Sequence, residues 1–122
     1  MSNIKNVAII GTGVIGTGWV IRCLAHGKKV RAYDFNLKHK KNLIKEIKRS
    51  WPFVKKMFKK KKLNLHNLSF YTNLHDALIK AEFIFECAPE NYTIKTKLMK
   101  RIGLYSKPNS IISCLLYTSP SP

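Results

Sequence analysis

The sequence predicts an α/β protein with a doubly wound parallel sheet. Short apolar segments with the length of strands alternate with longer segments that have helical periodicity. The first of these segments, residues 5–10, is an apolar run without alternation, which is typical of a strand buried on both faces of a parallel sheet. The chain has 122 residues, which leaves room for a single domain. We expect an incomplete sheet of about five strands.

The first predicted strand and helix meet at a glycine-rich turn. Residues 5–10 form an apolar run that leads directly into Gly11-Thr-Gly-Val-Ile-Gly16. The apolar pattern then predicts a helix from Val14 to His26, and Gly27 provides a residue that ends helices readily.

A second strand, residues 29–33, precedes a region that we expect to contain a pair of helices. Asn36 can cap the first helix of the pair. The buried face of that helix is predicted from Leu37, Leu43, Ile44 and Ile47. Pro52 lacks an amide hydrogen, so a break or kink is expected near Trp51, followed by a basic helix over 54–62.

The second half repeats the alternation of strands and helices. Strands are predicted over 69–72, 83–87 and 110–113. Asn73-Leu-His-Asp76 has the spacing of a capping box and predicts a short helix. A longer helix is expected to start near Asn91, with a face made of Ile94, Leu98 and Ile102.

The glycine-rich turn has the GxGxxG spacing of a dinucleotide-binding site. Gly11 permits a tight turn, Gly13 lets the backbone approach a pyrophosphate, and Gly16 lets the helix pack close to the strand. The pyrophosphate would lie at the helix N-terminus, where amide hydrogens are free. The candidate cofactor residues in this Rossmann-type turn are Gly11, Thr12, Gly13, Val14, Ile15 and Gly16.

Asp34 determines the expected choice of cofactor. It ends the second strand, 23 residues after Gly11, where a carboxylate can accept the hydrogen bonds of an adenosine ribose. The same charge repels the 2′-phosphate of NADP, so the sequence predicts NAD. Three nearby cations act against this preference: Lys38, Lys40 and Lys41.

The net charge of +17 makes nucleic acid a partner to consider. However, the basic residues are 19 Lys and 4 Arg, whereas proteins that read phosphates favour the bidentate Arg fork. We therefore expect no nucleic-acid partner, and we interpret the lysine run at 55–62 as a solvated surface.

Other features place the chain in the cytoplasm. Cys23, Cys87 and Cys114 are far apart and form no disulfide framework, which fits a reducing compartment. Neither a signal peptide nor a transmembrane segment is predicted. Histidines and cysteines lack the spacing of a metal site, so no metal is expected. We interpret Cys87 as a buried apolar residue rather than as a nucleophile.

Two motifs resemble one family. Gly11-Thr-Gly-Val-Ile-Gly-Thr-Gly-Trp19 and Phe83-Ile-Phe-Glu-Cys-Ala-Pro-Glu90 are similar to the NAD-binding half of the 3-hydroxyacyl-CoA dehydrogenase superfamily. Within it, the L-carnitine 3-dehydrogenases are most similar and share the Trp51-Pro52 pair. The L-gulonate 3-dehydrogenases share the segment 86–91. The resemblance covers residues 5–113.

The resemblance implies NAD-dependent oxidation of a short 3-hydroxy acid to the 3-keto acid. It also implies that Glu90 and Lys95 contact the cofactor. We interpret Glu86, at the strand end, as structural support rather than as a catalytic group. Acyl-CoA enzymes of the superfamily hold CoA with a Ser and a Lys. Ser50 matches the first position, but Met57 occupies the second and Lys56 lies beside it.

Several alternatives remain open. The parent protein could be a 3-hydroxyacyl-CoA dehydrogenase of fatty-acid oxidation or an L-gulonate 3-dehydrogenase. A non-enzymatic module that binds NAD or nucleic acid is a further alternative. In all cases we expect Trp51 and Phe53 to pack in the core.

The domain is expected to comprise residues 1–113. Residues 114–122 resemble the translation of a sequencing adapter, and we expect a non-native tail there. The family's catalytic His, with its Glu, Ser and Asn partners, lies beyond the fifth strand, so no catalytic residue is assigned. A helical domain that binds substrate and forms a homodimer is expected to be missing, which would leave this fragment inactive.

Overall fold

The computed structural model describes residues 3–59, 62–88 and 92–114. Five strands form one sheet: β1 (Asn6–Ile10), β2 (Lys29–Tyr33), β3 (Leu68–Tyr71), β4 (Phe83–Glu86) and β5 (Ile111–Cys114). Four α-helices accompany them: α1 (Val14–Ala25), α2 (Lys38–Met57), α3 (Leu74–Leu78) and α4 (Tyr92–Tyr105). A short 3₁₀ helix, Leu65–Asn67, precedes β3.

All strand pairs are parallel, and the strand order is β3-β2-β1-β4-β5. The chain builds β1, β2 and β3 in one direction and then returns to the other side of β1 to add β4 and β5. This reversal makes the carboxyl ends of β1 and β4 a topological switch point, where α/β sheets bind their ligands. The structure confirms the predicted doubly wound α/β sheet.

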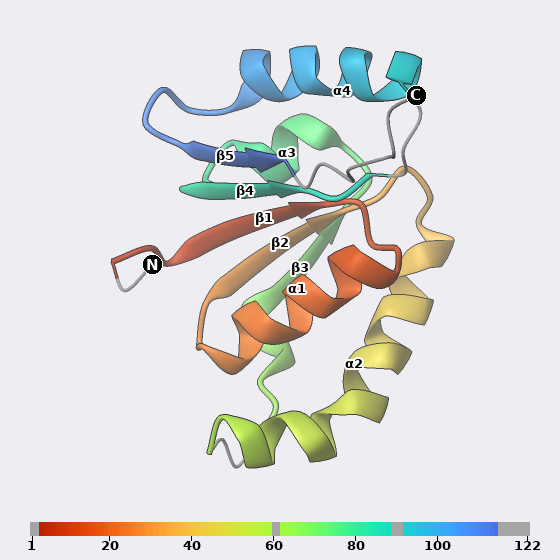
Figure 1. Cartoon of the computed structure of the whole chain (residues 1–122), viewed down its shortest axis with the longest axis vertical. Coiled ribbons are helices and arrows are strands. Elements are labelled where there is room, and N and C mark those ends of the chain that lie inside the picture. The colour runs from red at the N-terminus through yellow and green to blue at the C-terminus, as the bar shows by residue number, and fades with distance from the viewer. Residues whose placement is uncertain (1–2, 60–61, 89–91, 115–122) are drawn as a thin grey trace, which may run out of the picture.

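Helices cover both faces of the sheet, with α1 and α2 on one side and α3 and α4 on the other (Figure 1). Residues of β1 alternate between the two cores that result. Val7 and Ile9 pack with α1 and α2, whereas Ala8 and Ile10 pack with α3 and α4. All four are fully buried. This two-sided burial is the physical reason that β1 is apolar without alternation.

The predicted helical pair is wrong, because residues 38–57 form one helix, α2. Pro52 lies inside this helix, and Figure 1 shows that its last turns run in a different direction from its first. A proline removes one helical hydrogen bond and crowds the preceding turn, which bends a helix without ending it. The helix ends at Met57 rather than at residue 62, and Lys59 has a positive φ of 54°.

Three apolar residues lie outside the core, contrary to prediction. Phe53 is 72% exposed, although its neighbour Trp51 is buried. Both residues lie in the one helix α2, where positions two apart point to nearly opposite sides. Leu37 precedes the first turn of α2 and is exposed, and Ile94 is exposed on α4, where only Leu98 and Ile102 of the predicted face are buried.

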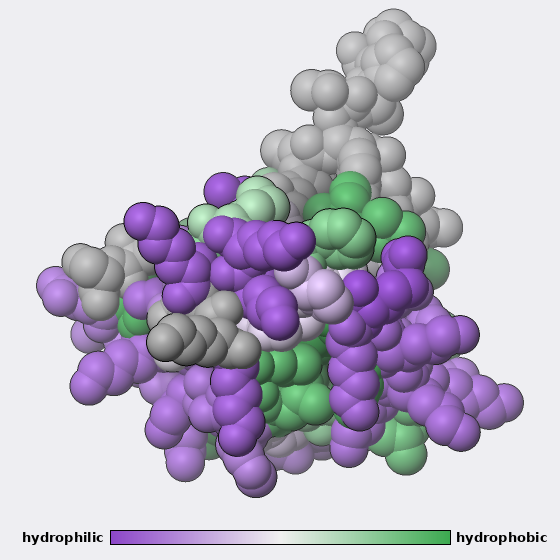
Figure 2. Space-filling view, turned by 90° about the horizontal axis from the view of Figure 1, so that it is seen from below, coloured by the Kyte–Doolittle hydropathy of each residue, from purple (hydrophilic) through white to green (hydrophobic). Residues whose placement is uncertain are grey.

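The basic residues that the structure describes in the lysine run are exposed: Lys55, Lys56, Lys59 and Lys62. Figure 2 shows hydrophilic side chains gathered on both sides of an apolar strip on the face viewed from below. Within the described residues, no helix is both long and apolar enough to cross a membrane.

Candidate functional site

The glycine turn between β1 and α1 is held by close backbone packing. Gly11 has a φ of +99°, which residues with a side chain rarely adopt, and its amide donates to the Tyr33 carbonyl at 2.8 Å. A Cβ on Gly11 would lie 2.9 Å from the backbone of Cys87 and Ala88. A Cβ on Gly16 would lie 2.8 Å from the Gly11 carbonyl carbon and closer still to its oxygen. Both glycines are therefore required by packing alone.

Gly13 differs from these two glycines, because a Cβ there would meet nothing within 4 Å. It is the N-cap of α1, and no side chain caps the first turn of this helix. The next residue, Val14, is 93% exposed. The helix thus presents free amide hydrogens and its positive dipole end beside an open backbone surface, which fits the phosphates of a dinucleotide.

Asp34 lies beside this turn, at the carboxyl end of β2. Its Oδ2 accepts hydrogen bonds from the Thr12 amide at 2.9 Å and from the Thr12 hydroxyl at 2.8 Å. Burial by itself would raise the pKa of the Asp34 carboxyl. The hydrogen bonds from Thr12, together with the His39 imidazole, outweigh burial and hold that pKa below its ordinary value. Asp34 is therefore an anion at neutral pH.

The contact between His39 and Asp34 was not anticipated from the sequence. His39 Nδ1 lies 2.7 Å from Asp34 Oδ1, and the imidazole comes from the first turn of α2. The sequence does contain one signal for this contact, because Asp34 at the end of a strand and His39 at the start of a helix are only five residues apart. However, that signal depends on the path of residues 35–37, which the sequence pattern does not define.

A second charged pair lies at the carboxyl end of β4. The Lys95 ammonium is 3.1 Å from Glu86 Oε1, and Glu86 is completely buried while Lys95 is 13% exposed. Glu86 Oε2 also accepts from the Ala88 amide at 2.6 Å, and the Cys114 thiol donates to Oε1 at 3.2 Å. Lys95 thus reaches the sheet edge that also carries the glycine turn. Glu90, the other predicted contact, lies outside the described residues.

The two buried cysteines lack the properties of nucleophiles. Burial raises the pKa of Cys23 to about 11 and that of Cys87 to about 12. Both therefore remain protonated at neutral pH, whereas nucleophilic attack needs the thiolate.

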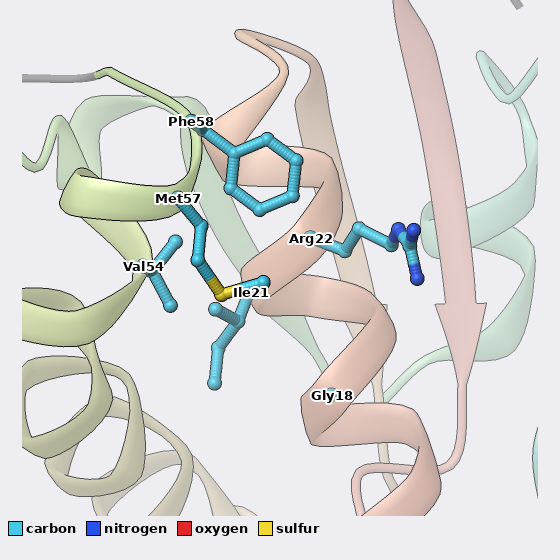
Figure 3. A pocket seen from close by; sticks show the side chains of 6 residues that line it. All are labelled: Gly18, Ile21, Arg22, Val54, Met57 and Phe58. Atoms are coloured by element: carbon cyan, nitrogen blue, oxygen red, sulfur yellow. The ribbon is translucent and has the colours of Figure 1, made fainter.

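A separate apolar pocket of 210 Å³ lies between α1 and the last turns of α2. Figure 3 shows Val54, Met57 and Phe58 of the α2 end facing Ile21 of α1, with Arg22 pointing away. On α1 the pocket is lined by Gly18, Ile21 and Arg22, none of which belongs to the glycine turn of residues 11–16, so the pocket is not part of the candidate site.

Comparisons with known proteins agree on one family. The family model described as 3-hydroxyacyl-CoA dehydrogenase, NAD binding domain, matches residues 6–119. The L-carnitine dehydrogenase of Staphylococcus epidermidis is 37% identical over 105 residues, which are 86% of this chain and 33% of that protein. The L-carnitine dehydrogenase of a Pseudomonas species is 36% identical over 113 residues, or 93% of this chain and 35% of that protein.

Solved structures show the same fold. The (S)-3-hydroxybutyryl-CoA dehydrogenase from Ralstonia eutropha superimposes with a TM-score of 0.80 at 26% identity, over 92% of this chain and 41% of that one. The 3-hydroxybutyryl-CoA dehydrogenase from Escherichia coli gives a TM-score of 0.77 at 24% identity, over 93% of this chain and 25% of that one. This chain spans about a third of the length of the curated relatives that it matches.

Proposed function

Since the chain belongs to the family of 3-hydroxyacyl-CoA dehydrogenase NAD-binding domains, we propose that it is the cofactor-binding part of an NAD-dependent dehydrogenase that oxidises a short 3-hydroxy acid. NAD is the cofactor of this domain. The observation that carries the proposal is the open backbone at Gly13 beside an anionic Asp34. When bound, the nicotinamide ring supplies the redox chemistry, and this chain supplies its attachment.

The proposed site divides the cofactor among three parts of the sheet edge. The amides at the start of α1, from Gly13 to Gly16, hold the pyrophosphate. Asp34 accepts hydrogen bonds from the hydroxyl groups of the adenosine ribose. Lys95, whose ammonium pairs with Glu86, contacts the cofactor at the β4 end, and Glu90 is the second contact that the family resemblance implies.

For the substrate we propose L-carnitine or a similar short 3-hydroxy acid, because two relatives at 36–37% identity carry that name. A 3-hydroxyacyl-CoA is the second candidate, supported by the similarity to two 3-hydroxybutyryl-CoA dehydrogenases. The first candidate is favoured because Met57 occupies the position at which acyl-CoA enzymes of the superfamily carry the lysine that binds CoA. We also propose that catalysis and homodimer formation belong to residues outside 1–113.

Titration of the full 122-residue chain with NADH tests the cofactor role directly. We expect saturable binding that is at least tenfold weaker for NADPH. Asp34→Ala should lower the affinity for NADH by about tenfold or more, because one or two hydrogen bonds to a charged group are lost. The difference between the affinities for NADH and NADPH should become smaller. Asp76→Ala is the matched control, because this exposed carboxylate on α3 should leave both affinities unchanged. Folded protein without saturable NADH binding would disprove the proposal.

Gly13→Ala provides a second test of the same site. Its Cβ would enter open space, so the free energy of unfolding should stay within about 1 kcal/mol of the wild type. The same methyl group would occupy the space of the pyrophosphate, so NADH affinity should fall by at least tenfold. A stable variant with unchanged NADH affinity would exclude Gly13 from the site.

A further inference from the structure

The carboxylate of Asp34 has no acceptor site left for a ribose hydroxyl. Its Oδ2 accepts from the Thr12 amide and hydroxyl. Its Oδ1 accepts from the Phe35 amide at 2.8 Å and from His39 Nδ1 at 2.7 Å. An ionised carboxylate offers about four lone-pair sites, so these four donors use all of them. A ribose that binds here must therefore replace one donor.

Among the four donors, His39 is the one that can leave at the least cost. The Thr12 and Phe35 amides belong to backbone that is fixed by the glycine turn and the end of β2. The Thr12 hydroxyl is on a buried residue. The His39 side chain is 44% exposed, and its ring packs in a T-shaped arrangement against the exposed Phe35 ring, with centroids 5.3 Å apart. A change of rotamer would move the imidazole into solvent without opening the core.

The charges around Asp34 point to a consequence for cofactor choice. No acidic residue lies in the first turn of α2, whereas Lys38, Lys40 and Lys41 are exposed there. A donor on Oδ1 disperses the negative charge by which Asp34 repels a 2′-phosphate. The imidazole and the three lysines therefore act in the same direction, which is against discrimination between NAD and NADP.

We propose that His39 is a specificity-determining residue that competes with the adenosine ribose for Asp34. This inference rests on the proposed dinucleotide site. The imidazole occupies the acceptor position that a ribose hydroxyl requires, and it is displaced when NAD binds. His39 thereby lowers the affinity for NAD and reduces the preference for NAD over NADP.

His39→Phe and His39→Ala in the full chain test the proposal. Phenylalanine keeps a ring beside Phe35 and removes the hydrogen-bond donor, whereas alanine removes both the donor and the ring. Comparison of the two variants therefore shows whether the ring itself hinders the ribose. We expect both variants to bind NADH about three- to tenfold more tightly, the equivalent of one half-exposed hydrogen bond. The ratio of NADPH to NADH dissociation constants should rise. His75→Phe is the matched control, since His75 is also half-exposed beside a carboxylate, at 3.8 Å from Asp76.

Binding of ADP and 2′-deoxy-ADP separates competition from a purely structural role. If His39 competes with the ribose, its removal should increase the advantage of ADP over 2′-deoxy-ADP. A structural role would change both ligands equally. Unchanged or weaker NADH binding by both folded variants, while the wild type binds NADH, would overturn the role of His39 alone. A folded wild type that binds no NADH would overturn both this inference and the proposed function.

Discussion

Replacement of Gly16 by alanine tests whether close packing at the glycine turn stabilises the fold. A Cβ at this position would lie 2.8 Å from the Gly11 carbonyl carbon and nearer still to the carbonyl oxygen. The obstacle is backbone, so no side chain can rotate away. Gly11 itself cannot retreat, because its α-carbon already faces the backbone of Cys87 and Ala88. Helix α1 would therefore have to move away from β1.

The cost of this movement can be estimated from the packing. Overpacking of a well-packed site costs about 1–3 kcal/mol. The rigid surroundings of Gly16 place it at the upper end of that range or above. Alanine within a helix gains about 1 kcal/mol relative to glycine. We therefore expect Gly16→Ala to lower the free energy of unfolding by on the order of 2–3 kcal/mol.

Gly18→Ala is the matched control on the same helix. A Cβ there would meet nothing within 4 Å, so only the gain in helix propensity applies, about 0.5–1 kcal/mol. Urea denaturation followed by circular dichroism measures both variants. Equal stabilities of Gly16→Ala and Gly18→Ala would contradict a packing role for Gly16, because they would show that α1 and the turn can separate without cost.

Three further predictions concern buried charges and thiols. Lys95→Met should destabilise the fold by about 3–5 kcal/mol, because it removes the cation that pairs with the fully buried Glu86 carboxyl group. Glu86→Gln in the same chain should restore most of that loss, and additive losses in urea denaturation would contradict the pairing. Because the pKa of Asp34 is lowered in the folded state, its contribution to stability is present above about pH 4 and is lost as the pH falls through the folded pKa. Asp34→Asn should reduce this loss of unfolding free energy at acid pH. An unchanged loss would show that other groups cause it. Iodoacetamide at neutral pH should modify the partly exposed Cys114 before Cys87, whose pKa is raised to about 12 by burial; equal rates in mass spectrometry would show that the core opens readily.

Most elements follow from local patterns. The apolar run before Gly11 predicted β1 nearly to the residue, because a strand buried on both faces has few polar positions. β2 follows from the alternation of Val30 and Ala32, which are buried, with the more exposed Lys29 and Arg31. Asn73 was predicted as the cap of α3, and its side chain accepts from the Asp76 amide at 3.1 Å. In these places the local signal and the tertiary environment favour the same conformation.

Other features could not be read from local patterns. From the sequence alone, a proline in a helical segment is compatible with either a break or a bend. In α2 the helix continues through Pro52, and its residues Leu43, Ile47 and Trp51 are buried. The exposure of Phe53 follows from helix geometry, since a residue two positions after the buried Trp51 lies on nearly the opposite side of the same helix.

Residue type and spacing along the chain were sufficient to predict the glycine turn, the acidic residue after β2 and the parallel sheet. The tertiary structure decided which groups those residues meet. Lys95 reaches Glu86 because β4 and α4 meet at the sheet edge, and His39 reaches Asp34 because α2 starts beside the end of β2. Contacts of this kind depend on how the elements pack in space, which the periodicity of a single segment does not contain.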